Sequence, residues 1–245
     1  MNLLTISWNA VGKEKAYLND VMERGRLVSY SEDGEVAGDY ISAWDIEAGD
    51  WVHDTYYYVN QPSWNYEDEQ TGEWIKYEST WMNSDMIPMN VEMESGSSFW
   101  LYHVGEDIAD FDFAGQVASG VKGYTLTGGQ MNLCGNPFPT ELNLADKKQV
   151  VISGATSYSE DGETAGDYVS AWDVGAGDWV HDTYYYVNQP SWNYEDEQTG
   201  ALVDYTDTWM NADMVPGNTP VQVGAGFWYY AVNNGTTLSF VDPVK

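Results

Sequence analysis

The stretch DWVHDTYYYVN at residues 50–60 has a hydrophobic pattern that suits two faces of an extended chain. The odd-numbered positions from Trp51 to Val59 lie on one face of an extended chain, and the even-numbered positions from Val52 to Asn60 lie on the other. A period of two in a run rich in Tyr, Trp and Val predicts a β-strand. DYISAW before it predicts a second strand, joined by the short Gly-containing stretch IEAGD, so residues 39–60 predict a β-hairpin. Trp44 and Trp51 flank this connection and are expected to pair across the strands.

Other segments also favour strands. FWLYHV, FWYYAV and TTLSFV predict later strands, and the SEDGE segments containing Gly34 and Gly162 predict turns. A short helix is expected within residues 13–23, where Leu18, Val21 and Met22 are spaced to face inward. The expected fold class is therefore mainly β, with two tandem, similar antiparallel β-sandwich-like domains.

The division into two domains follows from an internal repeat. Residues 29–72 and 157–200 align at an offset of 128 and differ at only four of 44 positions, and VHDTYYYVNQPSWNYEDEQTG occurs without change at 52–72 and 180–200. A period of this length exceeds that of solenoid or propeller repeats, so each copy is expected to have its own core. ASGVKG at 118–123 indicates a flexible join, which places the domains at 1–117 and 118–245.

The two copies differ at their beginnings. A strand-like piece, GYTLTGGQ at 123–130, precedes the second copy, whereas the first begins directly at MNLL. If this piece completes the second domain, an open strand edge is expected on the first domain, and such an edge is a template for a strand of another chain.

The charge balance limits the partners. The chain has 39 acidic and nine basic side chains and a formal net charge of −30, which repels nucleic acid and anionic lipid and favours a saline or calcium-containing environment. No apolar run is long enough for a membrane span, and no signal-peptide pattern is visible at the N-terminus. The single cysteine, Cys134, allows no intrachain disulfide and is expected to be a buried small hydrophobic residue.

Three stretches of the second copy occur in a characteristic order: GGQMNLCGNPFPTEL, WDVGAGDW and VGAGFWYYAV. This order resembles β-rich tandem repeat modules of large secreted or surface proteins of bacteria. The resemblance implies an extracellular or cell-surface location and a non-catalytic role. The first copy departs from the pattern, with NLLTISW at 2–8 and GSSFW in place of GAGFW.

Catalytic motifs of the common enzyme classes are absent from the sequence. There is no GxSxG, HExxH, GxGxxG or GxxxxGK[ST], and His53 and Asp54 point to opposite faces of a strand. His53, His103 and His181 are therefore expected to be packed or surface residues, and no enzyme and no catalytic residue is predicted. Calcium is the one cofactor that the acidic turns suggest, with candidate ligands Asp33, Glu35, Asp39, Asp161, Glu163 and Asp167.

Aromatic residues beside carboxylates form the remaining candidate site. Flat rings next to hydrogen-bond acceptors suit sugars and also suit protein contacts, although the same aromatics can simply fill two similar cores. The predicted ligand or assembly surface consists of Tyr56, Tyr58, Trp64, Tyr66, Asp68, Tyr184, Tyr186, Trp192, Tyr194 and Asp196.

Two functions of different classes follow from these residues. The favoured one is a non-enzymatic extracellular structural or adhesive surface module that associates with itself or with other surface proteins. The alternative is a bivalent carbohydrate-binding protein with one polysaccharide site per copy, stabilised by calcium. Nucleic acid and a membrane span are not expected in either case.

Overall fold

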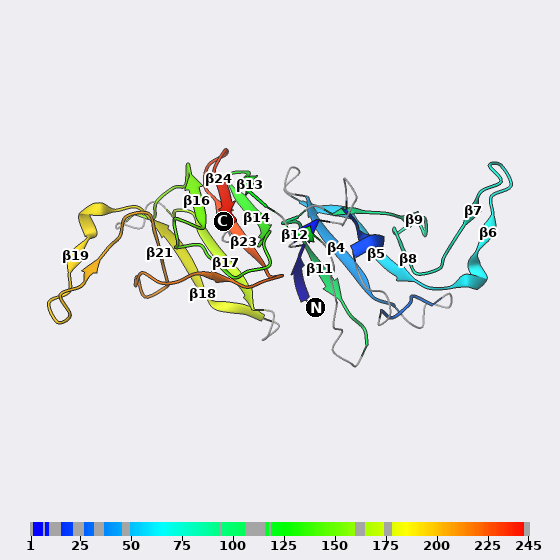
Figure 1. Ribbon diagram of the computed structural model, residues 1–245, viewed down its shortest axis with the longest axis horizontal. Coiled ribbons are helices and arrows are strands. Elements are labelled where there is room, and N and C mark those ends of the chain that lie inside the picture. Colours follow the sequence, from blue (N-terminus) through cyan, green and yellow to red (C-terminus); the bar gives the residue numbers. More distant parts are fainter. Residues whose placement is uncertain are drawn as a thin grey trace.

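The protein is an elongated, mainly β molecule in the computed structural model (Figure 1), which confirms the predicted mainly β, antiparallel class. The division into two domains stays a prediction. The structure describes residues 2–6, 8–9, 16–21, 27–31, 37–45, 50–93, 95–105, 116–117, 119–159, 165–173 and 178–242. Within these ranges the α-helical part is α1 (Leu18–Val21), inside the predicted helical segment, and Leu18 is buried as expected. No helix in the described ranges has the length and apolar character needed to cross a membrane.

The first copy forms a six-stranded antiparallel sheet. The predicted hairpin is confirmed, because β4 pairs with β5 and Trp44 lies opposite Trp51 in the register. One side of the sheet covers a core that includes Ile41, Trp81 and Phe99. In spatial order the strands are β1 (Asn2–Thr5), β11 (Ser98–Tyr102), β4 (Tyr40–Asp45), β5 (Asp50–Val59), β8 (Thr80–Met82) and β9 (Pro88–Met89).

Short two-stranded ladders accompany this sheet. One joins β3 (Ala16–Tyr17) to β10 (Glu92–Met93), and another joins β2 (Trp8–Asn9) to β12 (Gln116–Val117). In the second copy, β15 (Leu142–Asn143) pairs with β22 (Pro220–Val221).

The second copy is a sandwich of two sheets. Phe227 and Tyr229 from the larger sheet meet Leu238 and Phe240 from the smaller sheet, and all four are fully buried. The larger sheet has the order β14 (Gln130–Gly135), β23 (Gly226–Ala231), β17 (Tyr168–Asp173), β18 (Asp178–Val187) and β21 (Thr208–Met210), and the smaller has β13 (Val121–Thr125), β24 (Thr237–Val241) and β16 (Val150–Ser153). Cys134 lies in this core, as predicted, and burial raises the pKa of its thiol.

The strand-like piece at 123–130 belongs to two strands. β13 ends at Thr125 and β14 begins at Gln130, with a turn between them. β13 pairs with β24, so it does extend the second layer of the second copy. The first-copy positions equivalent to β24 lie outside the described residues, as do the predicted SEDGE turns, and the open edge of the first copy stays a prediction.

The two copies pack against each other through the faces of their sheets that point away from the two cores. Leu3, Leu133 and Trp172 are buried there, and Trp100 and Trp228 pack against them. The rings of Trp100 and Trp172 meet edge to face, with centroids 4.9 Å apart. Each described sheet takes its strands from one copy, yet a single hydrophobic cluster joins the copies.

Backbone contacts tighten this interface. Thr5 donates its N–H to the carbonyl of Gly224 at 2.9 Å, and Leu4 forms an isolated bridge with Ala225. A Cβ on Gly135 would collide with the side chains of Thr5 and Ser98, so the close packing of these side chains against β14 requires glycine. The equivalent first strands and closing strands of the two copies therefore meet at one junction. The domain boundary at 117/118 itself stays a prediction.

Candidate binding surfaces on two projecting arms

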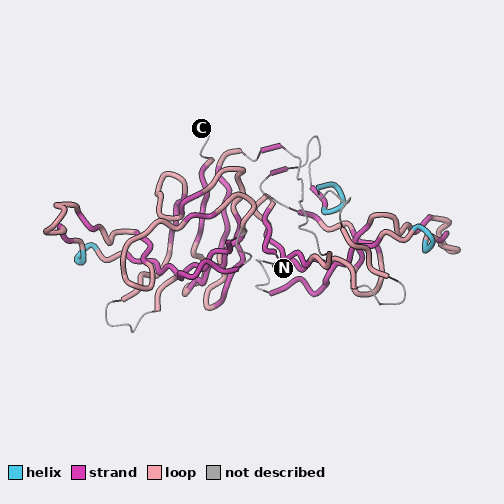
Figure 2. Tube along the Cα trace, turned by 90° about the horizontal axis from the view of Figure 1, so that it is seen from below, coloured by secondary structure: helices cyan, strands magenta, loops and turns pink. Residues whose placement is uncertain are grey.

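Two hairpin arms project from opposite ends of the molecule (Figures 1 and 2). We call residues 61–77 the first arm and residues 189–205 the second arm. Each begins where a long central strand ends and proline opens a 3₁₀ turn, η1 (Pro62–Trp64) or η2 (Pro190–Trp192). The arms then fold back through β6 (Tyr66–Glu67) with β7 (Trp74–Ile75), and β19 (Tyr194–Glu195) with β20 (Leu202–Val203).

Hydrogen bonds fix the base of each arm. Gln61 donates its N–H to the carbonyl of Tyr77 at 2.7 Å, and the amide oxygen of Asn65 accepts the N–H of Tyr77 at 2.6 Å. The second arm repeats both bonds, from Gln189 to Tyr205 and from Tyr205 to Asn193. These side-chain and backbone bonds explain why the NQPSWN segment is needed for the local fold, apart from any ligand.

The tip of each arm is a carboxylate-capped turn. Asp68 Oδ1 accepts the N–H groups of Gln70 and Thr71 at 2.8 and 2.9 Å, and Gly72 closes the turn at a φ of +70°. The hydrogen bonds from Thr71 and Gln70 lower the pKa of the Asp68 carboxyl. Asp196 repeats this arrangement and has a lowered pKa for the same reason, led by its bond from Thr199.

A three-ring cluster forms the stem of each arm. In the first arm Tyr77 is central: Trp64 meets it edge-on at 5.9 Å between ring centroids, and Tyr66 stacks on it at 6.4 Å. The Tyr66 side chain is still 51% exposed. The second arm has the same cluster, with Trp192, Tyr194 and Tyr205 at centroid distances of 6.0 and 6.3 Å.

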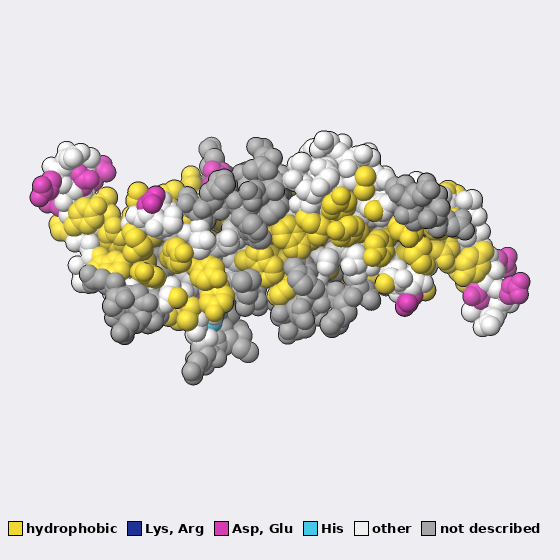
Figure 3. Space-filling model, turned by 180° about the vertical axis from the view of Figure 1, so that it is seen from behind, with side chains coloured by type: hydrophobic (Ala, Val, Ile, Leu, Met, Phe, Trp, Pro, Cys, Tyr) yellow, Lys and Arg dark blue, Asp and Glu magenta, His cyan; other side chains and the backbone are white. Residues whose placement is uncertain are grey.

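Six of the predicted surface residues are thus brought together in two equivalent sets. Tyr66 and Tyr194 are exposed, and the other members are partly buried in the stem or in the turn; the six are Trp64, Tyr66, Asp68, Trp192, Tyr194 and Asp196. Acidic side chains gather at both ends of the molecule, beyond hydrophobic side chains that extend along this face (Figure 3).

The prediction is wrong for the tyrosines of the central strands. Tyr56, Tyr58 and Tyr186 are at most 8% exposed and belong to the hydrophobic cores, and Tyr184 is partly buried against the second core. These residues occupy the inward face of β5 and β18. The sequence pattern did not reveal this, because alternation along a strand separates two faces without saying which one meets the core. Tyr56, Tyr58 and Tyr186 are therefore part of the packing and are not accessible to a large ligand, whereas Tyr184 keeps part of its surface exposed.

The outward face instead carries a tyrosine row in each copy that the sequence reasoning missed. Tyr57 lies between Tyr30 and Tyr40, at ring-centroid distances of 6.0 Å, and Tyr40 stacks on Tyr102 at 4.9 Å. In the second copy the row consists of Tyr158, Tyr185, Tyr168 and Tyr230. Burial raises the pKa of Tyr40 and Tyr168, and their neighbouring tyrosines add to this effect.

The first tyrosine row continues toward the first arm. An open hollow of about 470 Å³ is lined by Tyr30 at the end of the row, Trp64 in the arm, and Ser84 and Met86 in the turn after β8. Met86 holds a φ of +61°, and its carbonyl accepts the hydroxyl of Tyr77 at 3.2 Å. The arm is therefore braced against the body of the protein by an aromatic residue.

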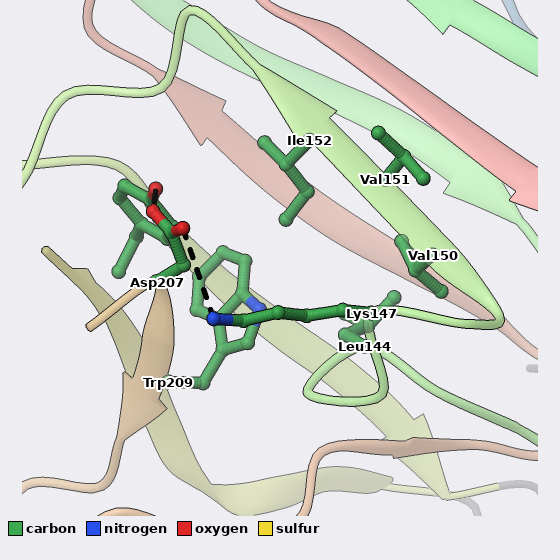
Figure 4. A pocket seen from close by; sticks show the side chains of 8 residues that line it. Leu144, Lys147, Val150, Val151, Ile152, Asp207 and Trp209 are labelled. Carbon is green, nitrogen blue, oxygen red and sulfur yellow. Dashed lines mark hydrogen bonds and ion pairs between the residues drawn. The ribbon is translucent and has the colours of Figure 1, made fainter. Parts of the chain in front are cut away.

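A separate cavity lies in the second copy, near the base of the second arm (Figure 4). It has a volume of about 150 Å³ and an apolar floor that includes Leu144, Ile152 and Trp209. Lys147 lies across its mouth, with Nζ 3.7 Å from Asp207 Oδ2 and 3.0 Å from the carbonyl of Thr206. The other carboxylate oxygen of Asp207 accepts the hydroxyl of Tyr186 at 2.7 Å.

The predicted calcium ligands are only partly described. Asp33, Glu35, Asp161 and Glu163 lie outside the described residues. Asp39 and Asp167 are fully buried, and both carboxylates accept hydrogen bonds from protein groups. In the part of the chain that the structure describes, no group of three or more His, Cys, Asp and Glu side chains is placed to hold a metal ion. Calcium binding stays a prediction.

Of the three histidines, His103 has a described side chain. His103 packs beside Asp39, with its Nδ1 2.8 Å from the carboxylate, and the side chains of His53 and His181 lie outside the described part. The Asp39 carboxylate is occupied by Val28 and Val104 N–H groups as well, so this pair ties segments of the fold together.

In comparisons with known proteins, no family model, curated protein or solved structure matches the chain.

Proposed function

We propose that the protein is a non-enzymatic extracellular or cell-surface module that associates with copies of itself or with other surface proteins. The observation that carries this proposal is the pair of arms at opposite ends of the molecule (Figure 1). Each presents large exposed side chains, Tyr66 and Trp74 on the first arm and Tyr194 and Leu202 on the second. Exposed aromatic and aliphatic side chains on a rigid stem favour protein contacts, since aromatic residues are enriched at the centres of interfaces.

Light scattering after size-exclusion chromatography, together with electron microscopy, tests this function. We expect the purified protein to form concentration-dependent oligomers or fibrous assemblies in calcium-containing saline. Salt is needed because a net charge of −30 makes molecules repel one another when it is unscreened. A monomer at high concentration under these conditions, and no binding to surface proteins, would contradict the proposal.

A bivalent carbohydrate-binding function is the second candidate, and it is favoured by the geometry of Tyr66 and Tyr194. Each ring has one neighbour stacked on it, Tyr77 or Tyr205, and each remains half exposed beside a glutamate. A ring in this situation suits stacking with the C–H face of a sugar, and two such sites on one chain give avidity for a polymer.

A glycan array separates the two functions. The intact protein is compared with the double variant Tyr66→Ala/Tyr194→Ala and with Tyr40→Ala/Tyr168→Ala, which removes tyrosines of the rows and leaves the arms unchanged. Loss of a polysaccharide signal in the first variant only would support carbohydrate binding at the arms. Silence of the intact protein across bacterial and host polysaccharides would remove this candidate.

A further inference from the structure

The first arm carries an exposed tryptophan that the second arm lacks. Trp74 on β7 is 60% exposed, and the equivalent residue on β20 is Leu202. Trp74 lies opposite Glu67 in the ladder and directly follows Glu73, and both glutamates are exposed. The arm thus presents the Trp74 ring with two carboxylates next to it and Lys76 two residues further along the chain.

The second copy carries a cavity with the complementary properties. Its volume of about 150 Å³ is close to that of an engineered protein cavity that binds benzene, so it has room for an aromatic ring. Lys147 lies at the mouth and Lys148 follows it, and these are two of only nine basic residues in the chain. Asp207 and Asp204 lie beside Lys147, so the charge complementarity to Glu67 and Glu73 is supplied by the two lysines and not by the mouth as a whole.

The ion pair at the mouth does not prevent entry. Lys147 and Asp207 are separated by 3.7 Å, and their side chains are 58% and 48% exposed. An exposed pair of this kind contributes little to stability, so Lys147 can turn to a carboxylate of an incoming arm at small cost. In Figure 4 the lysine side chain spans the opening above Trp209.

The polar groups at the mouth are not duplicated. Leu144 and Leu18 donate their N–H groups to the equivalent carbonyls of Thr219 and Val91, so Lys147 corresponds to Val21. Asp207 corresponds to Ser79 at the repeat offset of 128. The tryptophan therefore belongs to the first copy and the basic mouth to the second, in halves that extend to opposite ends of the molecule (Figure 1). A contact between two different surfaces of identical molecules is heterologous, and it propagates as an open chain unless a rotation closes it into a ring.

We propose that Trp74 of one molecule inserts into the cavity beneath Lys147 of a second molecule, with Glu67 and Glu73 facing Lys147 and Lys148. Copies of the protein join head to tail through this contact. The inference rests on the proposed self-association and names the surfaces that carry it.

Two variants test the contact, one at the inserted tryptophan and one at the mouth of the cavity. Trp74→Leu gives the first arm the residue that the second arm already has, so its fold is expected to be kept. Lys147→Glu/Lys148→Glu reverses the charge of the mouth at exposed positions. The matched controls are Leu202→Ala on the second arm and Lys122→Glu on β13, and circular dichroism confirms that each variant is folded.

Sedimentation velocity of the full chain in saline buffer is the readout. The wild type and the controls are expected to form a concentration-dependent series of oligomers. Each contact variant alone is expected to associate at least tenfold more weakly. A mixture of the two contact variants is expected to stop at a one-to-one dimer, because one supplies only an intact cavity and the other only an intact tryptophan.

The outcomes separate this contact from the proposed function. If the wild type assembles and both contact variants assemble equally well, the inserted tryptophan is overturned and self-association stands. If the wild type assembles and the mixture of variants yields no dimer, the contact is likewise overturned. If the wild type remains monomeric at all concentrations, both self-association and this contact are overturned.

Discussion

His103 pairs with the buried Asp39, with Nδ1 of the histidine 2.8 Å from Oδ2 of the carboxylate. The equivalent aspartate of the second copy, Asp167, accepts the hydroxyl of Tyr229 instead, at 2.9 Å. The repeat offset places Leu101 at the position of Tyr229 and Ala231 at the position of His103. Both copies therefore have a buried aspartate. Its side-chain partner comes from a different position in the equivalent segments 101–103 and 229–231.

We expect His103→Ala to lower the free energy of unfolding by about 1 kcal/mol, because it removes the side-chain hydrogen bond to Oδ2 of the buried Asp39 carboxylate and leaves that oxygen with the Val28 N–H alone. Urea denaturation measures this change. The double variant Leu101→Tyr/His103→Ala rebuilds the arrangement of the second copy and should recover part of the loss. An unchanged midpoint in the single variant would show that the pair does not stabilise the fold.

The turn at the arm tip gives a second prediction. Asp68→Ala removes the acceptor of the Gln70 and Thr71 N–H groups, so exchange of these amide hydrogens should become faster. Glu69→Ala is the control, since this exposed neighbour is not part of the turn bonding. The lowered pKa of Asp68 means that its contribution to stability is present above the usual value of 3.8 and is lost as the pH falls through the lower, folded-state pKa. Equal exchange rates in both variants would contradict the capping role.

The junction between the copies gives a third prediction. Trp100→Ala removes the ring that meets Trp172 and should cost roughly 3 kcal/mol. We expect calorimetry to resolve two transitions in this variant, because each copy has its own core and the shared cluster couples them. Tyr102→Ala, two residues further along the same face, is the control. A single transition with the wild-type midpoint in Trp100→Ala would exclude this coupling.

Tyrosine ionisation gives a prediction for alkaline pH. Burial, the largest cause in each case, raises the pKa of six tyrosines above the usual value of 10.0: Tyr40, Tyr77, Tyr168, Tyr186, Tyr205 and Tyr229. Above pH 10 the unfolded chain releases these protons while the folded chain keeps them, so the free energy of unfolding falls as the pH rises.

Urea midpoints measured at several pH values from about 9 to 11.5, together with tyrosinate absorbance, check this prediction. The absorbance of the folded protein should rise at a higher pH than that of the unfolded protein. Coincident titration curves for the folded and unfolded states would contradict it.

The sequence predicted the local elements well and the choice of exposed face poorly. Alternation located β5, and the position of the connecting turn was sufficient to pair Trp44 with Trp51. In the run of three tyrosines at 56–58, however, both faces are aromatic, so the pattern gives no sign that Tyr57 is the outward one. The exposed face is decided by contacts with Trp81 and Phe99, which are distant in the sequence.

The candidate site was predictable only where it is local. The aromatic and acidic residues of each arm lie within one hairpin, and their order in the sequence already placed them together. The cavity brings Lys147 on one side to Asp207 and Trp209 on the other, about sixty residues later, and no periodic pattern connects them. The cluster of Leu3, Trp100 and Trp172 likewise depends on how two sheets meet, which repeat spacing does not specify.

The junction built from Leu3, Leu133 and the three tryptophans makes one chain the counterpart of a homodimer whose subunits have been fused. Fusion keeps the two halves at a high effective concentration. The interface between them therefore does not have to be self-complementary, as the interface between separate identical subunits must be. At the junction Thr5 and Gly135 occupy equivalent register positions and differ, whereas Leu3 and Leu133 are equivalent and both leucine. The segments 52–72 and 180–200 have stayed identical over twenty-one positions. The molecule can therefore act as a spacer that offers a similar hairpin at each end, with Trp74 on one and Leu202 on the other.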